Sequence, residues 1–333
     1  MVAKSREVIY QPYRFSIAPM LDCTDRHFRV IFRHISKRAL LYTEMIVAKA
    51  LLHQKGSSLL DFNEIEHPIS LQIGGDDPKE LAEAAKIAEI WGYDEINLNV
   101  GCPSSKVKAG KFGACLMAHP TQVAKCIEAM KSATNLPVTI KHRTGIDYLD
   151  SDESLLKFVD EIASAGADRF AIHARKAWLS GLNPKQNRTI PPLEYEKVGR
   201  IKEKRPELKI ELNGGLKTPI NCLNALQKFD GAMVGRAAYS NPMLWKEIDA
   251  LIFGDKIIEK KQSEIIKALI PYAEAHLNQD GRMWDICKHI LQLVQGIPGA
   301  RAWRREVTAN GQKANADLSV LKSAALQLEK KGF

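Results

Sequence analysis

The sequence has 333 residues, of which 45% are hydrophobic, so it is long enough for one large domain and a smaller one around a sizeable core. Charged residues make up 26%, and Pro and Gly are not enriched, which excludes a chain dominated by disorder. The net charge of +9 favours a polyanionic partner, although many basic proteins bind no nucleic acid.

The sequence lacks long apolar segments and lacks the cysteine spacing of a metal site. No run of eighteen apolar residues occurs, and residues 1–15 lack the apolar region of a signal peptide, so we expect a soluble, cytoplasmic protein with no membrane partner. The six cysteines show neither CxxC nor Cys/His spacing, so neither a metal site nor a disulfide framework is predicted. Most of them, including Cys126 and Cys222, are expected to be buried and inert.

Short apolar runs alternate with longer segments of helical period along the first three quarters of the chain. The runs are 15–18, 40–43, 69–73, 95–99, 138–141, 169–173, 209–213 and 231–234. Helices are predicted between them, for example over 78–91, 120–133, 155–165 and 219–228. This alternation predicts the α/β class and a (β/α)8 TIM barrel. A doubly wound sheet is the alternative, but it usually has a glycine-rich turn after its first strand, where this chain has APMLD.

After residue 245 the strand pattern stops, and only amphipathic helical segments follow. We therefore predict a barrel domain over residues 1–248 and a small all-α domain over 249–333. The longest irregular segment within the barrel is 176–192, and loops of that length in compact domains tend to be functional.

The carboxyl ends of barrel strands usually carry the reactive groups, so the residues at these ends form the candidate site. Gly214 and Gly215 follow Asn213 at the seventh strand end, and Gly235 and Arg236 follow the eighth. Backbone N–H groups made accessible by glycine, with a guanidinium beside them, predict a phosphate site. Either pair alone is better explained as an ordinary tight turn, but both pairs at these two strands favour phosphate binding.

Three polar residues, Gln72, Lys141 and His173, end other predicted strands. A cation such as Lys141 can stabilise electron density on the pyrimidine edge of a reduced flavin, and the other two can bond its ring or phosphate. Each of the three taken alone is better explained as a structural residue. All three are expected at the carboxyl ends of barrel strands, on one rim of the barrel, and this shared position favours cofactor binding.

Cys102 follows the fourth predicted strand in the stretch NLNVGCPSSK. Gly101 and Pro103 constrain the backbone on either side, so the thiol is expected to project from a defined loop. A thiol is a competent proton donor, and this position favours that role over the usual buried, inert cysteine. Cys102 is the predicted catalytic acid.

Basic residues gather in three segments, two of which also contain a tryptophan. The segments contain Lys106, Lys108 and Lys111; then Arg175, Lys176, Lys185 and Arg188 with Trp178; and then Arg301, Arg304 and Arg305 with Trp303. Cations interleaved with an aromatic side chain can hold phosphates and stack an unpaired base. For the third segment a solvated helix face is an equally good interpretation.

Many of these stretches resemble the tRNA-dihydrouridine synthases, and especially their DusA subfamily, which modifies tRNA positions 20 and 20a. The matching stretches include SIAPMLDCTDRHFR, YDEINLNVGCPS, GKFGACLM, VTIKHRTGID, IHARKAWLSGLNPKQNR, NGGLKT, MVGRAAYSNP and GARAWRRE. They extend from residue 15 to residue 306, which is nearly the whole chain. The resemblance implies an FMN-binding barrel, a C-terminal helical tRNA-binding domain, a monomer, and NADPH, or else NADH, as the reductant.

The resemblance also implies roles for single residues. The implied FMN contacts are Pro19, Met20, Leu21, Gln72, Lys141, His173, Asn213, Gly214, Gly215, Gly235 and Arg236. The implied tRNA contacts are Asn99, Ala109, Lys185, Arg188, Arg301 and Arg304, and the implied proton donor is Cys102. Two positions depart from the family: Cys23 stands where Trp is frequent, and Ala109 replaces a larger polar residue, which weakens that contact.

The reaction that these residues suggest is reduction of the C5=C6 bond of a uridine flipped out of the tRNA D-loop. Hydride would pass from the reduced flavin to C6, Cys102 would give a proton to C5 from the opposite face, and Asn99 would orient the uracil. One alternative is an FMN barrel that acts on a free pyrimidine, as dihydroorotate dehydrogenases do, but it leaves the helical segment and the basic insertion unexplained. Another is an RNA-binding protein whose barrel has lost its chemistry, against which the intact Cys102 and Lys141 argue.

Overall fold

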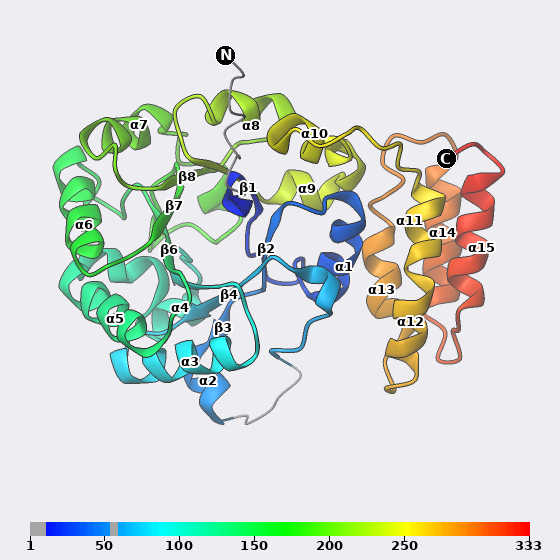
Figure 1. The fold of residues 1–333 in the computed structure, drawn as a ribbon, viewed down its shortest axis with the longest axis horizontal. Coiled ribbons are helices and arrows are strands. Elements are labelled where there is room, and N and C mark those ends of the chain that lie inside the picture. Colours follow the sequence, from blue (N-terminus) through cyan, green and yellow to red (C-terminus); the bar gives the residue numbers. More distant parts are fainter. Residues whose placement is uncertain (1–10, 54–58) are drawn as a thin grey trace, which may run out of the picture.

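A computed structural model describes residues 11–53 and 59–333, without the side chain of Lys106. Residues 1–10, which include most of the segment considered for a signal peptide, lie outside this description. Eight parallel strands of the described chain close into a barrel (Figure 1). They are β1 (Phe15–Ile17), β2 (Leu40–Tyr42), β4 (Ile69–Gly74), β5 (Glu95–Val100), β6 (Val138–Arg143), β7 (Arg169–His173), β8 (Ile210–Asn213) and β9 (Gly231–Val234).

The strand pairings close the sheet in chain order. β1 pairs with both β2 and β9, β2 pairs with β4, and each later strand pairs with the next one along the chain. A ninth strand, the two-residue β3 (Ile46–Val47), adds to β4 outside this ring. The predicted (β/α)8 barrel is confirmed, and all eight predicted runs are strands.

Helices surround the barrel, and their starts carry recognisable sequence signals. The helices of this part are α1 (Arg26–Ile35), α2 (Ala48–His53), α3 (Pro78–Ile90), α4 (Ser105–Ala109), α5 (Pro120–Ala133), α6 (Asp152–Ser164), α7 (Tyr195–Lys204), α8 (Pro219–Ala225), α9 (Arg236–Ser240) and α10 (Ile248–Phe253). Proline opens α3, α5 and α8, where its missing N–H costs nothing. Side chains of Asp25, Asp77 and Ser151 accept the first N–H groups of α1, α3 and α6.

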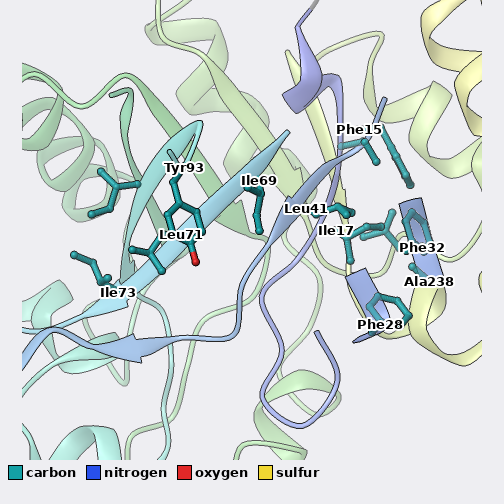
Figure 2. Packing of buried hydrophobic residues seen from close by; sticks show 14 of the residues in the cluster. Phe15, Ile17, Phe28, Phe32, Leu41, Ile69, Leu71, Ile73, Tyr93 and Ala238 are labelled. Carbon is teal, nitrogen blue, oxygen red and sulfur yellow. The ribbon is translucent and has the colours of Figure 1, made fainter. Parts of the chain in front are cut away.

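Successive side chains along a strand alternate between an apolar and a polar environment. On β5, Ile96, Leu98 and Val100 belong to the hydrophobic core, whereas the intervening Asn97 and Asn99 bond to polar residues of neighbouring strands. The apolar core therefore lies between the barrel and its helices. Figure 2 shows part of this core, with Ile17 of β1 and Leu41 of β2 on the side of Phe28 and Phe32 of α1, and Leu71 of β4 on the side of Tyr93.

The lower barrel interior is filled by a buried ion-pair network. Arg169 Nη2 lies 2.6 Å from a carboxylate oxygen of Glu95, and Arg169 Nε lies 3.2 Å from one of Glu211. Tyr42 donates a hydrogen bond of 2.9 Å to the same Glu95, and Thr139 donates one of 2.7 Å. Because Glu95, Arg169 and Glu211 lie at the first or second residue of their strands, this network closes the barrel below its mouth.

The chain ends in a helical bundle beside α1 (Figure 1). It consists of α11 (Gln262–Ala268), α12 (Ile270–Leu277), α13 (Met283–Ile290), α14 (Ala300–Gly311) and α15 (Ser319–Glu329). This confirms the predicted helical region after the barrel. The division near residue 248 stays a prediction, and α10, which begins there, contacts α8 of the barrel. None of the described helices is long and apolar enough to cross a membrane.

Polar contacts join this bundle to the barrel at the start of α1. Asp25 lies 2.9 Å from His289 Nε2 and 2.8 Å from Lys288 Nζ, both on α13. His27 Nδ1 lies 2.9 Å from the hydroxyl of Tyr272, and its ring packs edge-on against His276. The loop before α1 is also the one that carries Pro19 to Leu21, so the bundle is anchored next to the barrel mouth.

Candidate active site at the barrel mouth

Two predicted site residues, Gln72 and Asn99, lie side by side at the barrel mouth. The side chain of Asn99 donates a hydrogen bond of 2.8 Å to Gln72 Oε1, and Gln72 Nε2 donates one of 2.8 Å to Asn97 Oδ1. Both side chains are buried, with 1% of Gln72 and 8% of Asn99 exposed. Each amide nitrogen has a second N–H, so each can also bond a ligand in the mouth.

Asn99 also fixes the loop that carries Cys102. Its Oδ1 accepts hydrogen bonds from the N–H groups of Gly101, at 3.1 Å, and Cys102, at 3.0 Å. On the other side, the carbonyl of Cys102 accepts a bond of 2.9 Å from the N–H of Ala114. A Cβ on Gly113 would lie 2.7 Å from that carbonyl, so only glycine allows this approach. The half-buried thiol of Cys102 thus projects from a backbone that is held on both sides.

The mouth is rich in positive charge. Burial lowers the pKa of His173 well below its ordinary value, and the nearby charges of Arg143, Lys141, Arg175 and Arg236 lower it further, so the imidazole is neutral. Burial, followed by the charge of Arg143, lowers the pKa of Lys141 to about 8. No described residue forms a hydrogen bond or ion pair with the ammonium of Lys141. An anionic or electron-rich ligand would supply the missing partner.

The turn after β8 forms a glycine cradle, by which we mean Gly214 and Gly215. Both have positive φ angles, +105° and +71°. A Cβ on Gly214 would lie 2.7 Å from the His173 ring, and one on Gly215 would meet Leu193 and Tyr195. Only glycine therefore fits at these two positions, which is typical of turns whose backbone N–H groups bind phosphate.

The other predicted cofactor contacts surround this cradle. Asn213, at the end of β8, donates a hydrogen bond of 2.8 Å to the carbonyl of Met233. Gly235 precedes Arg236, which opens α9 and is exposed. The loop after β1 turns back at Met20, whose carbonyl accepts the N–H groups of Cys23 and Thr24. Its sulfur lies 3.3 Å from the Cβ position of Gly235, so the loops after β1 and β9 meet.

Pro19 and Leu21 flank Met20 in the loop after β1. Pro19 is half-buried and Leu21 is 55% exposed. The structure thus brings the predicted cofactor residues to one rim, while their binding role stays a prediction.

The residues predicted to touch tRNA are more dispersed. Lys185, Arg188, Ala109 and Arg301 are exposed. The carbonyl of Arg188 accepts a hydrogen bond of 3.1 Å from Arg236, which places this part of the insertion beside the mouth. Lys108 Nζ lies 3.3 Å from the carbonyl of Leu179, which joins the loop after β5 to this insertion.

The stacking role considered for the tryptophan of the third basic segment is excluded. Trp303 is only 3% exposed, and its indole N–H donates a hydrogen bond of 3.0 Å to the carbonyl of Ala324, so it cannot stack an unpaired base. The neighbouring Arg304 is held by the carbonyl of Leu291 and by Gln295, both at 2.9 Å. Trp178 remains half-buried, with Lys176 Nζ 4.3 Å from its ring centre.

Sequence reasoning missed Arg143 and Asn187, which are buried beside the mouth. Arg143 donates hydrogen bonds to three backbone carbonyls, and Asn187 organises the insertion. The only available signal for Arg143 was its place two residues after Lys141 on the same strand, which puts both side chains on one face.

The fold and this mouth define a (β/α)8-barrel enzyme whose strands carry polar and positively charged side chains at their carboxyl ends. The family described as Dihydrouridine synthase (Dus) matches residues 16–330, and the chain belongs to this family. The resemblance noted in the sequence is therefore confirmed.

Several curated relatives that match the chain carry the name tRNA-dihydrouridine(20/20a) synthase. The protein from Synechocystis sp. is 50% identical over 315 residues, which cover 95% of this chain and 94% of the relative. The protein from Escherichia coli O6:H1 is 50% identical over 325 residues, 97% of this chain and 98% of the relative. The protein from Vibrio cholerae is 49% identical, covering 95% of this chain and 96% of its own.

Among solved structures, a complex of 2-naphthoyl-CoA reductase matches with a TM-score of 0.52 and 11% sequence identity. The match covers 72% of this chain and 51% of that structure, so the chain spans about half the length of that protein. At this identity the likeness supports the barrel fold alone.

Proposed function

We propose that this chain is an FMN-dependent oxidoreductase that reduces uridine to 5,6-dihydrouridine at positions 20 and 20a of the tRNA D-loop. The supporting observation is the mouth itself, where the fixed loop of Cys102 shares one rim with the unpartnered ammonium of Lys141 and the glycine cradle. The names of the curated relatives, which match nearly the whole chain, agree with this activity.

The residues present fit FMN. The cradle and Arg236 suit its phosphate, with neutral His173 as a further hydrogen-bonding group. The free ammonium of Lys141 and the fixed amide of Gln72 suit the polar edge of the ring. The backbone of Pro19, Met20 and Leu21 lies at the same rim. When bound, FMN accepts a hydride from NADPH and supplies it to C6 of the uracil.

The chain itself supplies the orientation and the proton. Asn99 has one free N–H with which to hold a uracil carbonyl, and the same side chain holds the N–H of Cys102. One residue therefore sets both the position of the pyrimidine and that of the thiol. Cys102 gives its proton to C5, which completes the addition of two hydrogens across C5=C6, and the resulting thiolate recovers a proton from water.

The tRNA is held by the basic insertion and by the helical region over residues 249–333. Lys185 and Arg188 are exposed, and the carbonyl of Arg188 is bonded to Arg236 at the mouth. Contacts at Ala109, Arg301 and Arg304 stay predictions, as do the monomeric state, the location in the cytoplasm and the preference for NADPH over NADH.

Turnover on different substrates tests this function. With NADPH, the purified protein should convert undermodified tRNA to dihydrouridine-containing tRNA and should be inactive on free uridine and on orotate. Turnover of a free pyrimidine at a comparable rate would favour a small-molecule reductase instead. Binding of tRNA without any flavin reduction would favour an RNA-binding protein.

A further inference from the structure

Arg143 is a buried arginine whose three hydrogen bonds all go to backbone carbonyls of other loops. It ends β6 and is 3% exposed. Its Nε donates a bond of 2.8 Å to the carbonyl of Gly101, and its Nη1 donates bonds of 3.1 Å to those of Lys176 and Asn187. The planar guanidinium can bridge carbonyls in different directions, which the single ammonium of a lysine cannot do in the same way.

One of these carbonyls belongs to the catalytic loop. Gly101 immediately precedes Cys102, whose N–H is bonded to Asn99. Arg143 also lies close enough to Cys102 for the charge of its guanidinium to act on that side chain. Burial lowers the pKa of Arg143 to about 10, so it remains positively charged at neutral pH. The guanidinium therefore fixes the loop and places a charge beside the thiol.

The other two carbonyls belong to the basic insertion, and Asn187 organises that segment. Its side chain is fully buried, accepts the N–H of Trp178 at 2.8 Å, and donates to the carbonyls of Trp178, at 2.9 Å, and Leu182, at 3.1 Å. Asn187 is followed directly by Arg188. A phosphate that contacts Arg188 is thus one residue from a carbonyl that Arg143 holds.

We infer that Arg143 is a positioning residue that joins the Cys102 loop to the insertion carrying Lys185 and Arg188, so that tRNA held by the insertion meets the thiol in a fixed geometry. The inference rests on the proposed function, because it concerns how that substrate is presented to that acid.

Arg143→Lys tests the link, with Arg33→Lys as the matched control. Arg33 is also a buried arginine, 6% exposed, and it also donates to backbone carbonyls, those of Ser36, Ala39, Glu66 and Pro68, but these lie outside the loops of the mouth. Both substitutions should lower the Tm. Only Arg143→Lys should also change the rate at which iodoacetamide modifies Cys102, followed by peptide mass spectrometry.

In kinetics, Arg143→Lys should lower kcat on tRNA about tenfold or more while flavin reduction by NADPH keeps the parental rate, because a loss of positioning acts on the step that Cys102 serves. Arg33→Lys should keep the parental kcat. Equal effects of the two variants on Cys102 modification and on kcat would overturn the inference, since a general loss of stability would then explain both.

Asn187→Ala disturbs the insertion, which is the other segment that Arg143 holds. This variant keeps the inference testable if Arg143→Lys does not fold. Asn187 forms no hydrogen bond with Cys102, yet its replacement should change the modification rate of that thiol if the link exists. An unchanged rate would contradict the link. A parent enzyme that makes no dihydrouridine would instead refute the proposed function, so the two failures are distinguishable.

Discussion

Lys141 combines three properties that rarely occur together in a lysine without a function. It is half-buried, it lies beside the charge of Arg143, and none of the described residues pairs with its ammonium. Burial and the neighbouring cation both disfavour the charged form, which lowers its pKa to about 8. An anionic or electron-rich ligand offsets both effects by stabilising the charged form, so ligand binding and protonation of Lys141 are linked.

This linkage gives the affinity for FMN a pH dependence. Below pH 8 the ammonium is charged and attracts the ligand; above it the amine is neutral, so affinity should fall as pH rises, by up to about tenfold per pH unit. Titration of the flavin-free protein with FMN, followed by fluorescence, measures this. Lys141→Met should bind more weakly and lose the dependence near pH 8. An identical pH profile in both proteins would exclude Lys141 as the titrating group.

Among the elements, the turn after β8 shows how backbone conformation creates a binding site. The glycine cradle exists because two successive residues adopt positive φ angles, and the space above Gly214 is occupied by His173 rather than being open. A side chain at Gly214 would displace the imidazole as well as strain the backbone.

Gly214→Ala should therefore reduce FMN retention strongly and lower the free energy of unfolding by about 1–3 kcal/mol. Gly181→Ala is the control, because Gly181 also has a positive φ, +82°, but a Cβ there meets no atom within 4 Å. The control should cost comparable backbone strain and keep FMN. The measurements are urea unfolding and the flavin content of the purified proteins. Loss of FMN in both variants would show that strain alone, rather than the cradle, governs retention.

The sequence predicted the elements that depend on local pattern and failed where contacts come from distant segments. All eight barrel strands follow from short apolar runs, but β3, with two residues, is too short to be recognised. Arg143 was missed because its role depends on carbonyls of two other loops.

The burial of Trp303 could have been predicted from the sequence. Trp303, Val307 and Gly311 are buried at a spacing of four residues along α14, so helical periodicity places the indole on the inner face of the helix. The same spacing argues against stacking on a base, which was one of the two interpretations that the basic composition left open.

For the whole molecule, the junction of barrel and helical bundle is built around histidines and a carboxylate. The hydrogen bond and the charge of His289 hold the pKa of Asp25 far below its usual range despite burial, so this carboxylate is ionised. Burial lowers the pKa of His27 to about 3, so this imidazole is neutral. Because the unfolded chain takes up a proton at His27 near pH 6.5 and the folded chain does not, His27 makes folding less favourable as pH falls below that value.

His27→Gln should remove this part of the acid sensitivity. Between about pH 6.5 and 4.5 the parent should lose about 2–3 kcal/mol more of its free energy of unfolding than the variant does. His119→Gln, at an exposed position, is the control and should show the same change in the free energy of unfolding with pH as the parent. Urea unfolding at both pH values measures the difference. Parallel slopes for the parent and His27→Gln would show that His27 is protonated in the folded protein.

The thiol of Cys102 at the barrel mouth is the centre of the account, and single-turnover chemistry tests it most directly. Enzyme with reduced FMN is mixed with undermodified tRNA without oxygen, and dihydrouridine is mapped along the tRNA by mass spectrometry. The parent should form it at positions 20 and 20a. Cys102→Ala should still bind tRNA and still be reduced by NADPH, but should form dihydrouridine about 10²–10⁴ times more slowly. Formation at the parental rate in Cys102→Ala would contradict the account.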